Sequence, residues 1–304
     1  MLLLFAEKAA EAGEQAPAVV QFVNHYVGEP LHSLQMQYTY PFWQTFLGYF
    51  GTTPEKAFGE YTVENAVPWY TVMFLIAVAL AFVVVWVLKP RRLSVEEPTY
   101  GQLILEEGVV AIRNLLVDNV GPHGLRYFPV VATFGILILV SNLMGLIPGL
   151  MAPTSAVSVT FALGITSFVY YNAIGIRENG LLGHLRHFAG PIVWLAPLLF
   201  VVELISNFVR PISLGVRLFG NMFSDEQVMT QISNLYPPYT NFLLPVALMF
   251  LSVFVAFMQT FIFVLLSIIY ISEVSHAPHA EHHGAEEHPN MSEEGGVLTL
   301  PAHT

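Results

Sequence analysis

Two arginines interrupt an otherwise apolar part of the sequence, and their spacing places them on one side of a helix. Arg210 and Arg217 are seven residues apart, and Glu203 precedes Arg210 by another seven. Seven residues are close to two helical turns, so these three side chains share a face. Polar residues at steps of three and four continue the same stripe: Ser206, Ser213 and Asn221, with Asn207 at its edge. The opposite face is expected to carry Leu204, Phe208, Ile212, Phe219 and Met222.

An arginine in the middle of a membrane-spanning helix needs a special environment. Its insertion costs roughly 2.5–3.5 kcal/mol, so the side chain is expected to face protein or a water-filled path. A fixed positive charge there blocks the free passage of cations and favours the ionised form of a nearby carboxylate. The alternative is that both arginines reach an interface or pair with Glu203. For Arg210 this structural interpretation and the functional one are equally supported. Arg217 favours the functional one, because no acid lies near it in the sequence before Asp225.

Further polar candidates lie beyond Arg217. Asp225 and Glu226 come at the far end of the charged helix, and Glu226 is about 13 Å from Arg217 along a continuous helix. A carboxylate there could collect protons from water, or it could simply be a solvated helix end. Asn221 and Gln259 are uncharged groups that can bond water or orient a guanidinium. Gln259 alone would equally suit a helix–helix contact.

The composition is that of an integral membrane protein. The chain has 304 residues, of which 55% are hydrophobic and 11% charged, against about 25% charged in ordinary soluble domains. It has no cysteine, which excludes thiolate metal sites and a cysteine nucleophile. No basic patch with aromatic residues suggests nucleic acid. The stretch His279 to His288 could hold a metal weakly, but a solvated tail is the preferred interpretation, and no cofactor or metal is expected.

Apolar runs predict an all-α membrane protein with about five membrane-crossing helices. The expected spans are 67–88, 128–148, 155–176, 191–225 and 241–271, which together with an interfacial amphipathic helix at 100–118 form a membrane domain over 67–275. Residues 1–66 are predicted to form an extension at the membrane surface, with a short helix near 15–27 and irregular structure after it. Residues 177–190 are expected to be a polar interruption. Residues 276–304 are expected to form a disordered acidic tail.

Two further patterns concern the last span and the loops. Ser252, Ala256, Gln259 and Ser267 form a second stripe, which is typical of closely packed membrane helices. Basic residues gather in the loops on one side, which predicts an outside N-terminus and a cytoplasmic C-terminus. We expect the chain to lie in a bacterial inner membrane.

The run Ser213–Met222, SLGVRLFGNM, closely resembles subunit a of the rotary F-type ATP synthases. Gln259–Phe263, Ile269–Ile271 and Ser141–Pro148 extend the resemblance, which is strong over about 128–275. The resemblance implies a stator subunit beside a rotating ring of c subunits, each with a membrane-buried carboxylate. It also implies peripheral-stalk b subunits and the remaining synthase as partners, and no catalysis of ATP chemistry by this chain itself.

The resemblance also implies roles for individual residues. Arg217 would be the essential arginine that separates two offset half-channels and promotes deprotonation of the ring carboxylates. Asn221 and Gln259 would match the family's asparagine and glutamine. Glu226 would belong to the outer half-channel and Glu203 to the inner one, and the last two helices would lie strongly tilted along the ring.

One position departs from the family. Seven residues before the glutamine the family often has a histidine or an acid, and this chain has Ser252, which cannot titrate. Asp225 or water would then have to replace the titratable group that the family has at this position. The identity of the coupling ion, proton or sodium, depends on the ring and not on this chain.

Two other functions stay open at this point. The chain could be a self-contained secondary transporter or channel that uses Arg217 as its ion or substrate site, or a purely structural anchor. No acid lies in any predicted span at the depth of Arg217, so a proton path needs a carboxylate from another chain.

Overall fold

The computed structural model describes residues 17–49, 51–58, 66–89, 98–147, 150–189, 194–233 and 243–275. Within these ranges all regular structure is helical. The elements are α2 (Ala18–Leu34), a π-helical turn (Gln35–Thr39), α3 (Tyr40–Gly48), α4 (Pro54–Phe58), α5 (Trp69–Leu88), α6 (Tyr100–Val120), a 3₁₀ turn (Pro122–Tyr127), α7 (Phe128–Met144), a second 3₁₀ turn (Pro153–Ser155), α8 (Val157–Ala189), α9 (Ala196–Ser233) and α10 (Leu243–Ser275). The predicted tail at 276–304 lies outside the described residues.

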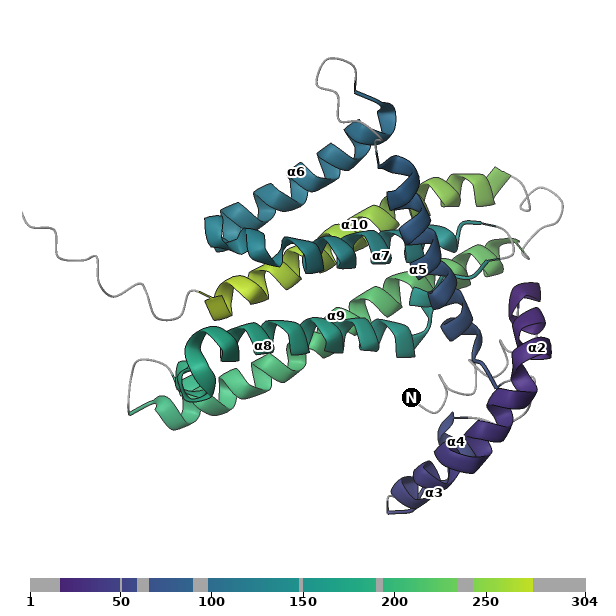
Figure 1. Cartoon of the computed structure of the whole chain (residues 1–304), viewed down its shortest axis with the longest axis horizontal. Helices are drawn as coiled ribbons and strands as arrows, with labels where there is room; N and C mark the ends of the chain where they lie inside the picture. The colour runs from purple at the N-terminus through teal and green to yellow at the C-terminus, as the bar shows by residue number, and fades with distance from the viewer. Residues whose placement is uncertain are drawn as a thin grey trace, which may run out of the picture.

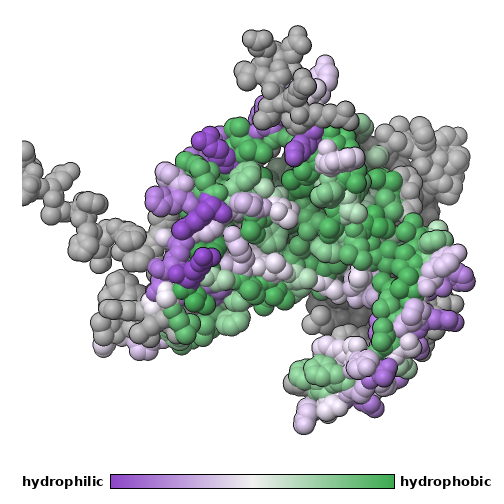
Figure 2. Space-filling view, viewed as in Figure 1, coloured by the Kyte–Doolittle hydropathy of each residue, from purple (hydrophilic) through white to green (hydrophobic). Residues whose placement is uncertain are grey.

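Five segments in the described ranges are long and apolar enough to cross a membrane, which confirms the predicted all-α membrane class. They are Trp69–Leu88, Pro122–Met144, Val157–Leu181, Pro197–Val228 and Leu248–Ser275. The shortest has 20 residues, which at 1.5 Å per residue matches a hydrocarbon core of about 30 Å. In the view of Figure 2 the middle of the molecule is hydrophobic and hydrophilic residues gather at its margins.

The helices pack as a bundle around α10. Figure 1 shows α7, α8, α9 and α10 running alongside one another, with α5 crossing them and α2 to α4 beyond one end of α5. α10 contacts α6, α7, α8 and α9. Its predicted stripe is its packed face, because Ser252, Ala256, Gln259 and Ser267 are all buried. The hydroxyls of Ser167 on α8 and Ser267 on α10 lie 3.1 Å apart and bond across this contact.

Two glycines let α8 and α9 approach almost backbone to backbone. A Cβ added to Gly164 on α8 would lie 2.7 Å from the carbonyl oxygen of Pro211 on α9. A Cβ added to Gly215 on α9 would lie 3.3 Å from the carbonyl oxygen of Thr160. Small residues at such crossings are the usual route to close packing of membrane helices. The two glycines therefore fix where α9, with its charged stripe, crosses the bundle.

The N-terminal segment is more helical than the sequence predicted. The expectation of irregular structure after residue 27 was wrong, because α2, the π-helical turn and α3 form a nearly continuous helix from Ala18 to Gly48. Tertiary contacts support it. The side chain of Asn24 donates to the carbonyl of Val67 and accepts from its N–H, and Gln35 donates to the carbonyl of Ala66. These bonds hold the segment against the start of α5.

The polar segment after residue 176 is helical, since α8 continues to Ala189. The helix is kinked at Gly180, which has a φ of 70° that glycine adopts without strain. His184 is buried beyond the kink and its ring lies against Gly175. Before the kink, Glu178 pairs with Arg126, and Asn179 donates to the carbonyl of Val274. These contacts explain why a polar sequence is ordered here.

Candidate functional site

The packed face of α9 is apolar. Leu214 and Leu218 are buried in a cluster with α7, α8 and α10, and Met222, which the sequence placed opposite the polar stripe, is buried as well. The outward face carries exposed Ile205, Phe208, Ile212 and Val216. Leu214, Leu218 and Met222, each four residues apart, bury that face in the bundle, and the polar stripe therefore lies along its edge.

Arg210 is fully paired. Its Nη2 donates to Oε1 of Glu203 over 3.1 Å and to Oε1 of Glu273 over 2.7 Å, and its Nη1 lies 2.7 Å from Oε2 of Glu273. The guanidinium also lies over the ring of Tyr270, 5.2 Å from its centre. The predicted alternative for Arg210, an ion pair with Glu203, is confirmed, and Glu273 of α10 is an additional partner.

Arg217 is in the opposite situation, two turns further along the same helix. Its side chain is exposed on the bundle. Within the described residues it forms no ion pair and no hydrogen bond with another side chain. Apolar Val216 beside it is also exposed, and so is Ser213 one turn before it. The chain thus presents an uncompensated guanidinium on an apolar surface.

Asn221 and Gln259 are brought together across α9 and α10. The amide of Asn221 donates to Oε1 of Gln259 over 2.6 Å. Gln259 is buried, and its own Nε2 has no partner within the described part of the chain. A buried amide donor without a partner is unusual and marks a place for water or for another group. Asn221 lies one turn of α9 beyond Arg217.

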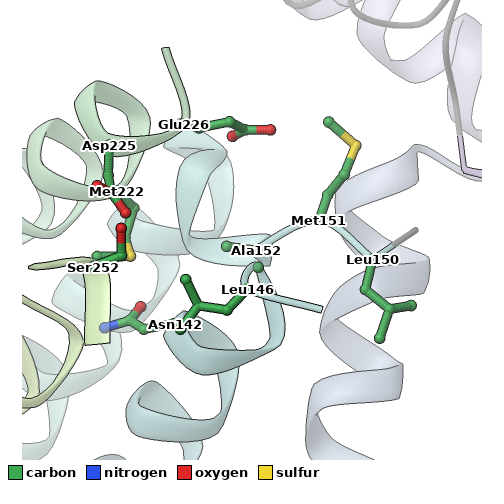
Figure 3. Close-up of a pocket in the computed structure, with 10 residues that line it drawn as sticks. Asn142, Leu146, Leu150, Met151, Ala152, Met222, Asp225, Glu226 and Ser252 are labelled. Carbon is green, nitrogen blue, oxygen red and sulfur yellow. The ribbon is translucent and has the colours of Figure 1, made fainter. Parts of the chain in front are cut away.

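Asp225 and Glu226 line a cavity of about 140 Å³, which has room for several water molecules. Ser252 and Met222 form part of the same lining, so the non-titrating serine faces the same space as two carboxylates. Figure 3 shows Asp225 and Ser252 on one side of the cavity and Glu226 directed to the other side, toward Met151. Glu226 also interacts with the side chain of Ser155.

Asn142 of α7 is a cavity residue that the sequence analysis did not single out. It is buried, its Oδ1 accepts from Thr154 over 2.7 Å, and its Nδ2 has no partner among the described residues. It lines the cavity with Asp225 and Ser252 (Figure 3). Its signal in the sequence was its place in an apolar span beside another polar residue, Ser141.

A second, more open cavity of about 240 Å³ lies between α9 and α10. It is lined by Asn221, Ser224 and Asp225 of α9 and by Leu248, Leu251 and Val255 of α10. Asp225 belongs to both cavities. Asp225 therefore lies between the smaller cavity at Ser252 and the more open one at Asn221.

A buried polar network lies on the other side of Arg217, toward Glu203. The hydroxyl of Tyr171 donates to Oδ1 of Asn207 over 2.7 Å, and Nδ2 of Asn207 donates to Oδ1 of Asn172 over 3.2 Å. The same Oδ1 lies 3.2 Å from Nε2 of His184. Since Nδ2 of Asn172 donates to the carbonyl of Phe168, its Oδ1 is the acceptor and His184 donates. The network joins α8 to α9 next to the Arg210 ion pairs.

Within the described ranges no three histidine, aspartate or glutamate side chains lie close enough to hold a metal ion. The histidine-rich stretch from His279 lies outside those ranges. Along α9 the described residues present the guanidinium of Arg217, which has no ion-pair partner among them, with the carboxylates of Glu203 on one side and of Asp225 and Glu226 on the other.

Comparison with known proteins gives a consistent result. The family model described as "ATP synthase A chain" matches residues 71–272. The chain is 41% identical over 216 residues to "ATP synthase subunit a" of Aquifex aeolicus, covering 69% of this chain and 98% of that protein. It is 45% identical over 170 residues to "ATP synthase subunit a 1" of Pelobacter propionicus, covering 56% of this chain and 72% of that protein. It is 45% identical over 174 residues to the subunit a of Trichlorobacter lovleyi, covering 57% and 74%.

Proposed function

Because this chain belongs to the ATP synthase A chain family, we propose that it is the proton-translocating stator subunit of an F-type ATP synthase. It works against a rotating ring of c subunits, and peripheral-stalk b subunits hold it in place. It carries no ATP chemistry itself. Two offset half-channels bring protons to and from the ring, and Arg217 separates them.

The observation that carries this proposal is the unpaired state of Arg217. The side chain lies exposed on an apolar surface, and no described acid compensates it. A cation in that position at membrane depth is costly unless a carboxylate is supplied from outside the chain. A ring whose subunits each carry a buried carboxylate supplies one at every step. The positive charge then favours release of the proton from the arriving acid and prevents a proton from passing directly between the half-channels.

The surface around Arg217 suits a large apolar partner. Both long helices carry exposed apolar side chains along their length: Val201, Ile205, Ile212 and Val216 on α9, and Phe250, Phe254, Phe257 and Phe261 on α10. A lipid-facing surface would be equally apolar, but it would not accommodate the guanidinium and the amide of Asn221. We therefore assign the c ring to this face.

The outer half-channel is assigned to the two cavities that share Asp225. Protons enter the smaller cavity at Glu226, Asn142 and Ser252, reach Asp225, and leave through the more open cavity at Asn221 toward the ring. In this route Asp225 supplies the titratable group that Ser252 does not. Water in the cavities completes the path, as the unpaired Nδ2 of Asn142 and Nε2 of Gln259 suggest.

The inner half-channel is assigned to the other end of α9. Glu203 lies 14 residues, or about four turns, before Arg217 on the same side of the helix. It accepts the proton that a ring carboxylic acid gives up there and passes it to water. With the basic loops on the inner side, the N-terminus lies outside and the C-terminus in the cytoplasm of a bacterial cell.

The runner-up function is a self-contained transporter or channel. To carry protons by itself, the chain would need its own acid beside Arg217, and the described residues provide none at ion-pair distance. It predicts ion flux by the purified chain alone in liposomes. The preferred function predicts flux only when the c ring is present.

The test is Arg217→Ala in the assembled synthase. Proton-driven ATP synthesis in membrane vesicles is expected to fall by at least about a hundredfold, as for other charges that stabilise a reacting group. Assembly, measured by co-purification with the ring, is expected to persist. Arg113→Ala, which removes an exposed arginine from the interfacial helix α6, is the matched control. Full synthesis by an assembled Arg217→Ala complex would overturn the proposal.

A further inference from the structure

Arg210 is shared unequally between its two carboxylates. Glu273 of α10 engages it with both oxygens, each at 2.7 Å from a guanidinium nitrogen, whereas Glu203 has one contact at 3.1 Å. A bidentate arginine–carboxylate pair is the stronger arrangement, because two parallel bonds share the charge. Glu273 is therefore the main partner of Arg210, and Glu203 is a secondary one.

This geometry has an electrostatic consequence for Glu203. The three groups carry two negative charges and one positive charge, so one negative charge remains after Glu273 has neutralised Arg210. The Oε2 of Glu203 has no hydrogen-bond partner among the described residues, and the side chain is one-third exposed. Among the other described residues, the hydroxyls of Tyr171 and Tyr270 lie nearest Arg210 and are neutral at physiological pH. His184 lies further along the polar network, bonded to Asn172. Glu203 thus retains a carboxylate oxygen that can take a proton.

We propose that Glu273 is a positioning residue for proton transfer on the inner side, acting by holding Arg210 away from a full ion pair with Glu203. The inference rests on the proposed function. A proton released by a ring carboxylic acid binds Oε2 of Glu203, and the neutral Glu203 then gives the same proton to water on the inner side. Arg210 and Glu273 keep their charges throughout, so neither gains nor loses a proton.

A full ion pair between Arg210 and Glu203 would hinder this proton transfer. If Glu273 were absent, Glu203 would be the one acid among the described residues that pairs with Arg210, and the pair could close into the bidentate form. A carboxylate held in that way must break two charge-assisted bonds before it takes a proton. The position of Glu273 near the end of the last helix matters here because it brings the competing carboxylate from α10, 63 residues further along the chain than Arg210.

A simpler role for Glu273 is that of a link between α9 and α10, and a double variant separates the two roles. In inverted vesicles that contain the complete synthase, Glu273→Gln is expected to slow ATP-driven proton pumping by about fivefold, the effect of a partly exposed ion pair. Adding Arg210→Gln removes the cation that would close on Glu203, so the double variant is expected to pump within about twofold of the parent. If Glu273 only links the helices, the double variant will be as slow as Glu273→Gln, and the proposal is overturned.

Two further measurements make the result unambiguous. Glu178→Gln breaks a different ion pair, the one with Arg126, and is expected to pump like the parent. If it slows pumping as much as Glu273→Gln does, the effect is a general loss of ion pairs and the proposal fails. Arg217→Ala in the same vesicles tests the proposed function separately, since a pumping Arg217→Ala complex would overturn that function whatever the double variant does.

Discussion

Asn221 on α9 donates its amide hydrogen to Oε1 of Gln259 on α10 over 2.6 Å, and this bond joins the two long helices one turn beyond Arg217. The two partners differ in environment, because Gln259 is buried and Asn221 is exposed on the bundle. The bond therefore fixes a polar group at the surface where the ring is proposed to pass.

Removing the two partners of this bond is expected to have unequal effects on stability. Asn221→Leu leaves both polar ends of the buried Gln259 unpaired, which costs about 1–3 kcal/mol of unfolding free energy. Gln259→Met leaves only the exposed Asn221, which can bond water, so its cost is smaller. The double variant removes both polar partners and is expected to be more stable than Asn221→Leu alone. Thermal unfolding of the purified chain in detergent measures all three, and equal losses would contradict the expectation.

The crossing of α8 and α9 is expected to tolerate no side chain at Gly164. In Gly164→Ala the new Cβ would lie 2.7 Å from the backbone oxygen of Pro211, so the helices must separate, at a cost of about 1–3 kcal/mol. The control is Gly108→Ala on α6, where a Cβ meets nothing within 4 Å and the helix gains roughly 0.5–1 kcal/mol. Thermal unfolding in detergent compares the two, and a Gly164→Ala chain as stable as the parent would show that the crossing adapts.

The carboxylates of Asp225 and Glu226, which line the cavity at Ser252, are expected to act together. Asp225→Asn combined with Glu226→Gln should slow proton-driven ATP synthesis on the order of a hundredfold, the usual contribution of a positioned acid–base group. Each single variant should lose less, since the other carboxylate still faces the same cavity. Glu29→Gln on α2, on the same proposed side of the membrane, is the matched control. Undiminished synthesis by the double variant would exclude this cavity from the proton path.

The proposed orientation can be tested by labelling, because the chain has no cysteine of its own. Tyr49 and Tyr100 are 86% and 88% exposed, so a cysteine at either position is open to a reagent. In intact cells a membrane-impermeant maleimide is expected to label the Tyr49→Cys variant and not the Tyr100→Cys variant. Tyr100→Cys should react only after the membrane is permeabilised. The reverse pattern would mean that the N-terminus lies inside.

The sequence was sufficient for the features that depend on local pattern. Apolar runs of about 20 residues predicted the five crossing helices, since the length of a spanning helix is set by the thickness of the bilayer. The small and polar stripe of α10 predicted its buried face, because a helix has the same period wherever it lies. The run around Arg217 indicated the family, which the comparisons confirm.

The tertiary structure decided which polar groups meet. Glu273 follows Arg210 by 63 residues, Gln259 follows Asn221 by 38, and Asn142 shares a cavity with Asp225 from another helix. Such pairs depend on where the helices cross and at what depth, and contacts such as Gly164 against Pro211 determine that. Helical period places a side chain on a face but does not say which helix that face will meet. For this reason the sequence alone separated Arg210 from Arg217 only by the acids near each along the chain, and the packing of α9 against α10 gave Arg210 its second acid, Glu273, while no described acid pairs with Arg217.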